Sequence, residues 1–353
     1  MTSAEITPEV KASYWYADGE TEESGDTLAN IDSSLFTHIF CAYADLDAHT
    51  HHVFVSSAHN FKFSGFTTSV QGGNPQVKAL LSISGGKAVF KSMANKPKSR
   101  KSFIDSSILI ARSMGFHGLD LAWQYPNSSE EMSDFGQLLK EWRSAVDDES
   151  NRTGNDCLLL TAAVYYTSEY NSASYPIQAI KDSLDWVNII AYDFYTPESS
   201  TVTAAAAGLY DPTKAERTCG EFGLTHWLNA GLPEKKAVFG FSYAGWAWTL
   251  KDGKDHGYDA AAKGVAFPPD GSIDYSQIKT FITSDQATPY HDPNVVGDYC
   301  YSGKTWIAYD DTLCITAKVQ YAKQKGLLGY FAWNVGADDK SVLSKAASAA
   351  WVA

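Results

Sequence analysis

Eight short apolar runs, separated by segments with helical periodicity, recur along the 353-residue chain and restrict its fold more than any other feature. In one run Val187, Ile189 and Ile190 are β-branched and Trp186 is aromatic, residue types that favour strands. Strands that alternate with helices indicate a parallel sheet, and eight is the number that closes a barrel. The runs are Val10–Trp15, His38–Tyr43, Lys78–Ile83, Gly118–Ala122, Leu158–Ala163, Trp186–Ala191, Lys236–Phe241 and Gly329–Trp333.

Helical patterns fill several of the intervals between these runs. The clearest three cover Ser99–Ser113, Glu130–Val146 and Asp311–Lys325. In the first, Phe103, Ile104, Ile108, Leu109 and Ile110 are the apolar positions. Each such segment is long enough to cover one side of a strand pair in a barrel.

One interval breaks the rhythm. Residues 245–302 are rich in Gly, Asp, Pro and Tyr and contain no clear strand–helix unit. We therefore predict an α/β fold, a (β/α)8 TIM barrel over residues 8–245 and 303–353, with a small α+β insertion lobe over residues 246–302 between strands 7 and 8. An open, doubly wound sheet is the alternative, and the absence of a Gly-rich phosphate loop after the first strand disfavours it.

The charge and hydropathy of the chain exclude several classes of partner. Its net charge of −13 makes nucleic acid a poor partner, because phosphate binding needs a basic face. It has no apolar segment of about 18 residues, so we expect no membrane insertion. Residues Met1–Val10 are polar and lack the apolar core of a signal peptide. Sequons at Asn127 and Asn151 suit a secreted or vacuolar glycoprotein whose signal peptide has been removed.

Five cysteines leave at least one thiol unpaired. Cys300 and Cys314 flank a short segment and are candidates for a disulfide, although sequence alone does not fix the pairing. No cysteine spacing matches a metal site, so we expect no metal and no cofactor.

Function in such a barrel is expected at the carboxyl ends of the strands. The fourth strand and its continuation run from Phe116 to Pro126. Because side chains alternate along a strand, Asp120, Ala122 and Gln124 are predicted to share the inward face, and Leu121 and Trp123 to point to the helix layer. One inward Asp beside a Gln is, by itself, more typical of a hydrogen-bonded structural group than of a catalyst.

This segment resembles the signature of glycoside hydrolase family 18, plant class V chitinase type, in which the inward residues are Asp, Asp and Glu and Tyr-Pro follows. The resemblance extends over nearly the whole chain in the same order and spacing. The other segments that carry it are Tyr14-Trp15, Phe36–Leu46, Leu80–Gly86, Trp186–Tyr195 and Gly329–Asn334.

The resemblance implies a substrate-assisted mechanism, in which the Glu protonates the glycosidic oxygen and the N-acetyl group of the substrate attacks the anomeric carbon. It also implies roles for particular residues here. Asp120 is retained, whereas Ala122 stands at the position of the middle Asp and Gln124 at that of the acid. Tyr192 and Asp193 match residues that hold the acetamido group, and Trp333 matches the floor of the sugar site.

Two of these positions have lost their acid, and an amide has no proton to donate near neutral pH. Loss of a general acid alone costs about 10²–10⁴ in rate. We therefore predict that the chain is not an enzyme and that no residue is catalytic. We predict instead a chitinase-related lectin that binds chitooligosaccharide or a glycoprotein N-glycan. Its expected sugar contacts are Tyr14, Tyr43, Asp120, Gln124, Tyr192, Asp193, Tyr195 and Trp333.

Further departures from the family pattern predict a reshaped pocket and hence a changed sugar preference. Ser84 replaces the first Gly of a Gly-Gly-Gly, Ile190 replaces Met, and Ala244 stands where an aromatic is expected. Residues 196–199 also differ from the Gly-Pro and Trp usual after Tyr195.

Two alternatives stay open at this point. One is an inactive, engineered class V chitinase, or a protein that retains weak or different chemistry through Asp120 and Asp193. The other is a storage or defence protein without a sugar ligand, which would leave no motif. If the chain agglutinates cells, a homodimer is expected, because agglutination needs two sites per particle.

Overall fold

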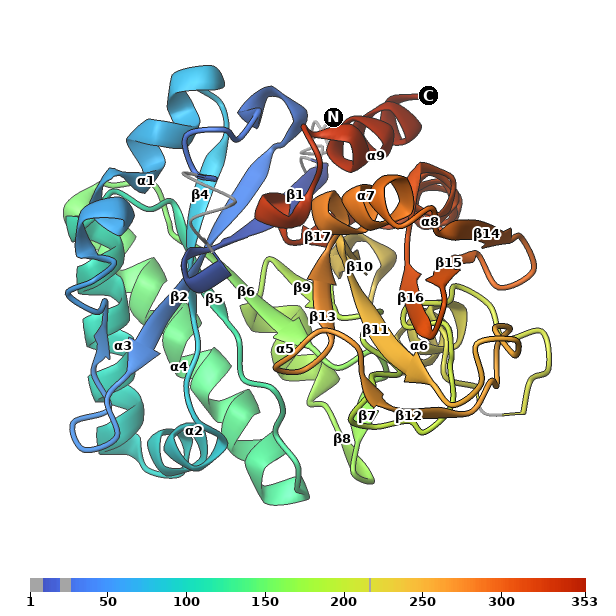
Figure 1. The fold of residues 1–353 in the computed structure, drawn as a ribbon. Helices are drawn as coiled ribbons and strands as arrows, with labels where there is room; N and C mark the ends of the chain where they lie inside the picture. The colour runs from blue at the N-terminus through green and yellow to red at the C-terminus, as the bar shows by residue number, and fades with distance from the viewer. Residues whose placement is uncertain (1–8, 20–26, 216) are drawn as a thin grey trace.

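The computed structural model describes residues 9–19, 27–215 and 217–353 (Figure 1). The polar segment Met1–Val10 and the predicted barrel start at residue 8 therefore lie almost wholly outside the described residues.

Within these ranges, eight parallel strands close into a barrel, because β1 pairs with both β2 and β17. The fold is thus the predicted (β/α)8 TIM barrel, and each predicted run coincides with a strand to within a few residues. The barrel strands are β1 (Val10–Tyr16), β2 (His38–Leu46), β4 (Lys78–Ile83), β5 (Gly118–Leu121), β6 (Leu159–Val164), β9 (Trp186–Ile189), β10 (Ala237–Ser242) and β17 (Gly329–Trp333).

Alternation along each strand divides the apolar residues between two cores. Tyr14, Phe40 and Phe331 face the barrel interior and pack together. Their chain neighbours, such as Trp15 and Leu81, face the helices. Both sides of every strand are therefore covered, which explains why the sequence shows mainly apolar runs rather than a strict apolar–polar alternation.

Helices surround the barrel, as the labelled ribbon shows (Figure 1). Their bounds are α1 (Asn60–Gly73), α2 (Lys87–Ala94), α3 (Pro97–Ser113), α4 (Ser129–Thr153), α5 (Ile177–Ser183), α6 (Gly220–Asn229), α8 (Thr312–Gln324) and α9 (Val342–Val352).

The predicted ends of two helices agree with the structure to within two residues, whereas the predicted end of a third does not. Helix α3 begins two residues earlier than predicted, with Pro97 in its first turn, where a missing N–H costs nothing. In α8 the predicted end residues Asp311 and Lys325 are the two caps. Helix α4 runs seven residues past Val146, because its polar last turns continue until Gly154 adopts a left-handed conformation with φ +74°.

The interval without a clear strand–helix unit forms a second sheet, which lies between β10 and β17 in the chain. Its strands are β11 (Ala244–Leu250), β12 (Ala262–Val265), β13 (Ser272–Asp274), β14 (Thr288–Asp292), β15 (Gly297–Ser302) and β16 (Thr305–Tyr309), with helix α7 (Tyr275–Ser284) between β13 and β14. This is the α+β insertion between strands 7 and 8. The exact boundaries of the lobe, 246–302, stay a prediction, although the sheet itself extends slightly beyond them on both sides.

The remaining strands among the described residues are short: β3 (Val53–Phe54), β7 (Glu169–Tyr170) and β8 (Ala173–Ser174). No helix in the described ranges is both long and apolar enough to cross a lipid bilayer. The five cysteines all lie in those ranges and all are free, so the candidate disulfide between Cys300 and Cys314 is not formed.

Candidate active site

A cleft of about 390 Å³ opens at the carboxyl ends of the barrel strands, where function was expected. Aromatic side chains dominate its walls, and a few polar groups lie among them. The lining residues are Tyr43, Gln124, Tyr125, Tyr165, Tyr166, Ile190, Tyr192, Asp193, Phe194, Thr218 and Trp333.

Trp333, at the end of β17, is the centre of an aromatic platform. Its ring stacks on that of Tyr43 with centroids 5.8 Å apart and planes at 20°. Tyr16 contacts both rings, at 5.4 Å from Trp333 and 5.9 Å from Tyr43. Trp333 is half-buried and also lines a neighbouring hollow of about 190 Å³ that includes Ala244 and Asp274. A flat face shared by two hollows is suited to a ligand longer than one ring.

Asp193 supplies a titratable group to the cleft. It follows β9, and its Oδ1 accepts a hydrogen bond of 2.7 Å from Nε1 of Trp246. Solvent reaches the side chain, but the crowded walls limit its hydration, and this desolvation raises the pKa of Asp193 to about 6 despite the Trp246 hydrogen bond. Because Trp246 belongs to β11, the insertion takes part in building the cleft.

The fourth barrel strand is shorter than predicted. Strand β5 ends at Leu121, so Ala122 and Gln124 lie in the segment that follows it. Gln124 is exposed in the cleft, whereas Ala122 is buried and absent from the cleft lining. Trp123 between them stacks on Phe90 in the helix-facing core, as the alternation predicted.

Asp120 is fully buried below the cleft. Its carboxylate accepts hydrogen bonds from the hydroxyls of Ser82 at 2.6 Å, Thr161 at 2.7 Å and Tyr14 at 2.9 Å. Burial raises the pKa of Asp120, and these hydroxyl donors oppose that rise. Tyr14 in turn accepts a hydrogen bond of 2.9 Å from Asn188. The group is a polar network that ties strands together across the barrel interior.

Three predicted sugar contacts lie outside the lining of the cleft. Tyr14 and Asp120 are 2% and 0% exposed and lie beneath the platform, so they support the cleft without lining it. Tyr195 packs against the apolar cluster of the insertion around Trp248. The structure brings the remaining predicted contacts together in one cleft: Tyr43, Gln124, Tyr192, Asp193 and Trp333.

The sequence analysis missed four aromatic residues of the cleft and the tryptophan that bonds Asp193. Tyr165 and Tyr166 directly follow β6. Their place at the carboxyl end of a barrel strand is the signal that could have identified them from the sequence. Their rings lie 4.8 Å apart, and Tyr165 contacts Tyr125 at 5.1 Å. The residues missed are Tyr125, Tyr165, Tyr166, Phe194 and Trp246.

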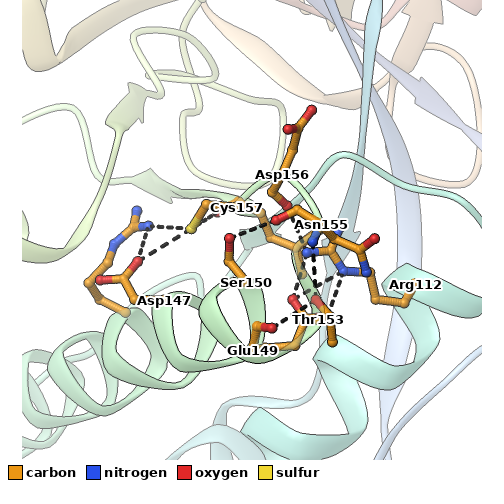
Figure 2. A network of polar contacts seen from close by, with 10 residues as sticks. Arg112, Asp147, Glu149, Ser150, Thr153, Asn155, Asp156 and Cys157 are labelled. Atoms are coloured by element: carbon orange, nitrogen blue, oxygen red, sulfur yellow. Dashed lines mark hydrogen bonds and ion pairs between the residues drawn. The ribbon is translucent and has the colours of Figure 1, made fainter.

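A larger cavity, of about 790 Å³, lies at the opposite end of the barrel, around the first residues of β2, β4, β6 and β9. Figure 2 shows the polar network on one side of it. Arg112 donates to both oxygens of Glu149 and to the backbone carbonyl of Asp156, and Ser150 donates to the carbonyl of Asn155. These groups already satisfy one another, and barrel active sites form at the carboxyl end. The aromatic cleft is therefore the better candidate.

Comparison with known proteins gives close relatives over nearly the whole chain. A class V chitinase of Arabidopsis thaliana is 56% identical over 345 residues, covering 97% of this chain and 89% of the relative. The class V chitinase CHIT5 of Lotus japonicus is 39% identical over 350 residues, covering 97% and 86%.

Solved structures also match nearly the whole chain. A class V chitinase mutant from Nicotiana tobaccum, in which one glutamate is replaced by glutamine, was crystallised in complex with NAG4. It is 45% identical, with a TM-score of 0.93, over 98% of this chain and 99% of that one. The chitinase-like agglutinin of Robinia pseudoacacia is 42% identical, with a TM-score of 0.88, over 97% and 99%.

The prediction that this chain is not an enzyme is wrong in view of these comparisons, because relatives that match at least 97% of it are named chitinases. The physical error was to infer loss of activity from two side chains of one strand. A second carboxyl group, that of Asp193, lies in the same cleft as Gln124 and has its pKa raised to about 6. The cleft therefore still holds a carboxyl group that can exchange protons.

The barrel, its insertion and the strand-end cleft agree with one family. The sequence profile described as "Glycosyl hydrolases family 18" matches residues 11–338, which is most of the chain. The chain therefore belongs to family 18 of the glycosyl hydrolases.

Proposed function

We propose that this protein binds oligosaccharides of N-acetylglucosamine in the aromatic cleft and acts on them as a glycoside hydrolase of low turnover. The observation that carries the proposal is the platform of Trp333 and Tyr43, with Gln124 and Asp193 at the same cleft. Flat aromatic faces with a few fixed polar groups are typical of sites that bind sugar rings.

Gln124 is suited to holding a sugar without donating a proton to it. Its amide has nearly the shape of a glutamic acid side chain and both donates and accepts hydrogen bonds. It also carries no negative charge. The tobacco relative that carries a glutamate-to-glutamine mutation was crystallised with NAG4, which supports binding by a cleft of this kind.

Turnover then requires another acid, and Asp193 is the group that the cleft offers. In the substrate-assisted mechanism of the family, the acetamido oxygen of the substrate attacks the anomeric carbon while an acid protonates the leaving oxygen. Asp193, with a pKa of about 6, is protonated in part near neutral pH. We expect the rate to be lower than with a glutamate at position 124, because Gln124 cannot share this role.

A second candidate function is recognition of glycoprotein glycans as an agglutinin. The similarity to the Robinia pseudoacacia agglutinin over 97% of this chain favours it. Agglutination needs two sites per particle, so this function predicts a homodimer. Cell agglutination assayed together with size-exclusion mass measurement separates it from a monomeric enzyme. Storage or defence without a sugar ligand predicts no binding to any glycan.

We also propose that the protein is a secreted or vacuolar glycoprotein. Asn127 and Asn151 are both exposed, Asn127 just before α4 and Asn151 in its last turn. Both are therefore reachable by the glycosylation machinery. Mass spectrometry of the protein from its natural source tests this, and unmodified peptides over both sequons would contradict it.

Substitution of Trp333 by alanine tests the binding site. The variant removes the stacking face and should weaken binding of the N-acetylglucosamine tetramer by about 30-fold or more, an effect of the size found when a central aromatic is truncated. Isothermal titration calorimetry measures it. Tyr290→Ala is the matched control, because Tyr290 is an exposed aromatic outside both hollows and should leave affinity unchanged. Equal affinity of Trp333→Ala and the wild type would refute the site.

A further inference from the structure

Three metal-ligating side chains meet where the insertion contacts the barrel, away from the cleft. His291 comes from β14, Asp298 from β15 and Cys314 from the first turn of α8. Their ligand atoms all lie within 4.8 Å of one another. Nδ1 of His291 is 2.8 Å from Oδ1 of Asp298 and 3.7 Å from Sγ of Cys314.

These distances are close to those of a tetrahedral zinc site. With Zn–N and Zn–O bonds of about 2.0–2.2 Å and a Zn–S bond of about 2.3 Å, nitrogen and oxygen lie about 3.4 Å apart, and nitrogen and sulfur about 3.6 Å apart. The nitrogen–sulfur distance already fits. The His291 and Asp298 side chains need to separate by about 0.6 Å, which a change of side-chain rotamer angle can supply. His291 is half-buried, so an ion has a path inward from solvent.

The charges around the cluster also suit a divalent cation. Oδ2 of Asp298 accepts a 2.7 Å hydrogen bond from the backbone N–H of Asp311, which fixes the carboxylate, as outer groups do around metal ligands. Cys314 lies in the first turn of α8, where the N-terminal end of the helix favours the thiolate form that binds a metal ion. The thiolate and the carboxylate together carry two negative charges. The adjacent buried pair of Lys318 and Asp310 is neutral as a whole.

We propose that His291, Asp298 and Cys314 bind a Zn²⁺ ion, with a water molecule as the fourth ligand, and that this ion joins the β14–β15 hairpin of the insertion to helix α8 of the barrel. Cysteine sulfur and histidine nitrogen together select zinc over magnesium or calcium, which prefer oxygen ligands. The sequence predicted no metal, because the ligands lie on three elements and form no spacing motif.

The site is tested with Co²⁺, which replaces Zn²⁺ and reports a bound thiolate by a charge-transfer absorption band in the near ultraviolet. The purified full-length chain is stripped of metal and titrated with Co²⁺ and, in calorimetry, with Zn²⁺. We expect the band at one Co²⁺ per chain. In Cys314→Ser the band is expected to disappear, and in both Cys314→Ser and His291→Ala the affinity for Zn²⁺ should fall by at least about tenfold. Zn²⁺ should raise the Tm of the wild type and not that of Cys314→Ser.

Two controls keep the result specific. Cys157→Ser removes an exposed thiol elsewhere and should keep the band and the affinity. Exposed histidines such as His49 and His52 lie elsewhere on the chain, and Co²⁺ bound to histidine alone gives no thiolate band. His291 is half-buried, so His291→Ala remains a test if Cys314→Ser does not fold. A wild-type chain without the band, or Zn²⁺ affinity unchanged in His291→Ala, would overturn the site.

Discussion

Replacing Gln124 with glutamate is expected to raise the rate of chitooligosaccharide hydrolysis by about 10²–10⁴-fold, the usual contribution of a positioned general acid. Gln124 is exposed in the cleft, and the resemblance places it where family 18 carries its acid. The substitution changes one terminal atom and adds a proton donor without adding volume. Release of a chromophore from an aryl N-acetylglucosamine oligosaccharide measures the change in kcat.

The control for this substitution is Gln76→Glu. Gln76 is exposed at the opposite end of the barrel, so the variant adds the same charge without changing the cleft. Adding Ala122→Asp to Gln124→Glu should raise the rate further by restoring the residue that orients the acetamido group, and the two effects are not expected to be additive. No gain in either the single or the double variant would show that the cleft has diverged beyond these positions, with Ala244 and residues 196–199 the places to examine.

Asp193→Asn is expected to reduce the turnover of the wild-type chain by about 10²–10⁴-fold, because it removes the proposed proton donor. The asparagine oxygen can still accept the hydrogen bond from Trp246, so binding of the sugar should be preserved in calorimetry. The wild-type rate should also depend on pH. Since the acid form donates the proton and desolvation raises the pKa of Asp193 to about 6, the rate should fall as the pH rises through about 6.

The pH profile distinguishes a proton donor from a structural role. Asp134→Asn is the matched control, because the pKa of Asp134 is also raised by desolvation, but it lies on α4 away from the cleft. It should keep both the rate and the profile. If Asp193→Asn keeps the wild-type profile, the proton comes from another group and the proposed mechanism is wrong.

Much of the fold could be predicted from the sequence because barrel strands are covered on both faces. Residues such as Val187 and Ile189 then give mainly apolar runs that are visible without any partner strand. The end of α4 could not be predicted in this way. Its last turns, with Asp147, Asp148 and Glu149, are polar and lack the apolar periodicity that the prediction used.

The site was predictable only as far as local alternation extends. Alternation placed Trp123 in the outer core correctly, but it could not show that β5 ends at Leu121. It also could not show depth along the barrel axis. Tyr14 and Asp120 face inward as predicted, yet they lie one level below the cleft and bond to each other.

Contacts between residues of different elements produce no pattern in any single stretch of the sequence. Trp246 reaches Asp193 from the insertion, and the proposed zinc ligands come from two strands and a helix. Such groups become adjacent only when distant segments fold together, so spacing rules do not detect them.

The most direct test of the proposed function is a crystal structure of the protein with the N-acetylglucosamine tetramer. We predict sugar density along the cleft, with one ring stacked on Trp333 and polar contacts to Gln124 and Asp193. Sugar bound at the cavity around Arg112, or absent from a crystal whose cleft is open to solvent at saturating ligand, would contradict the proposal.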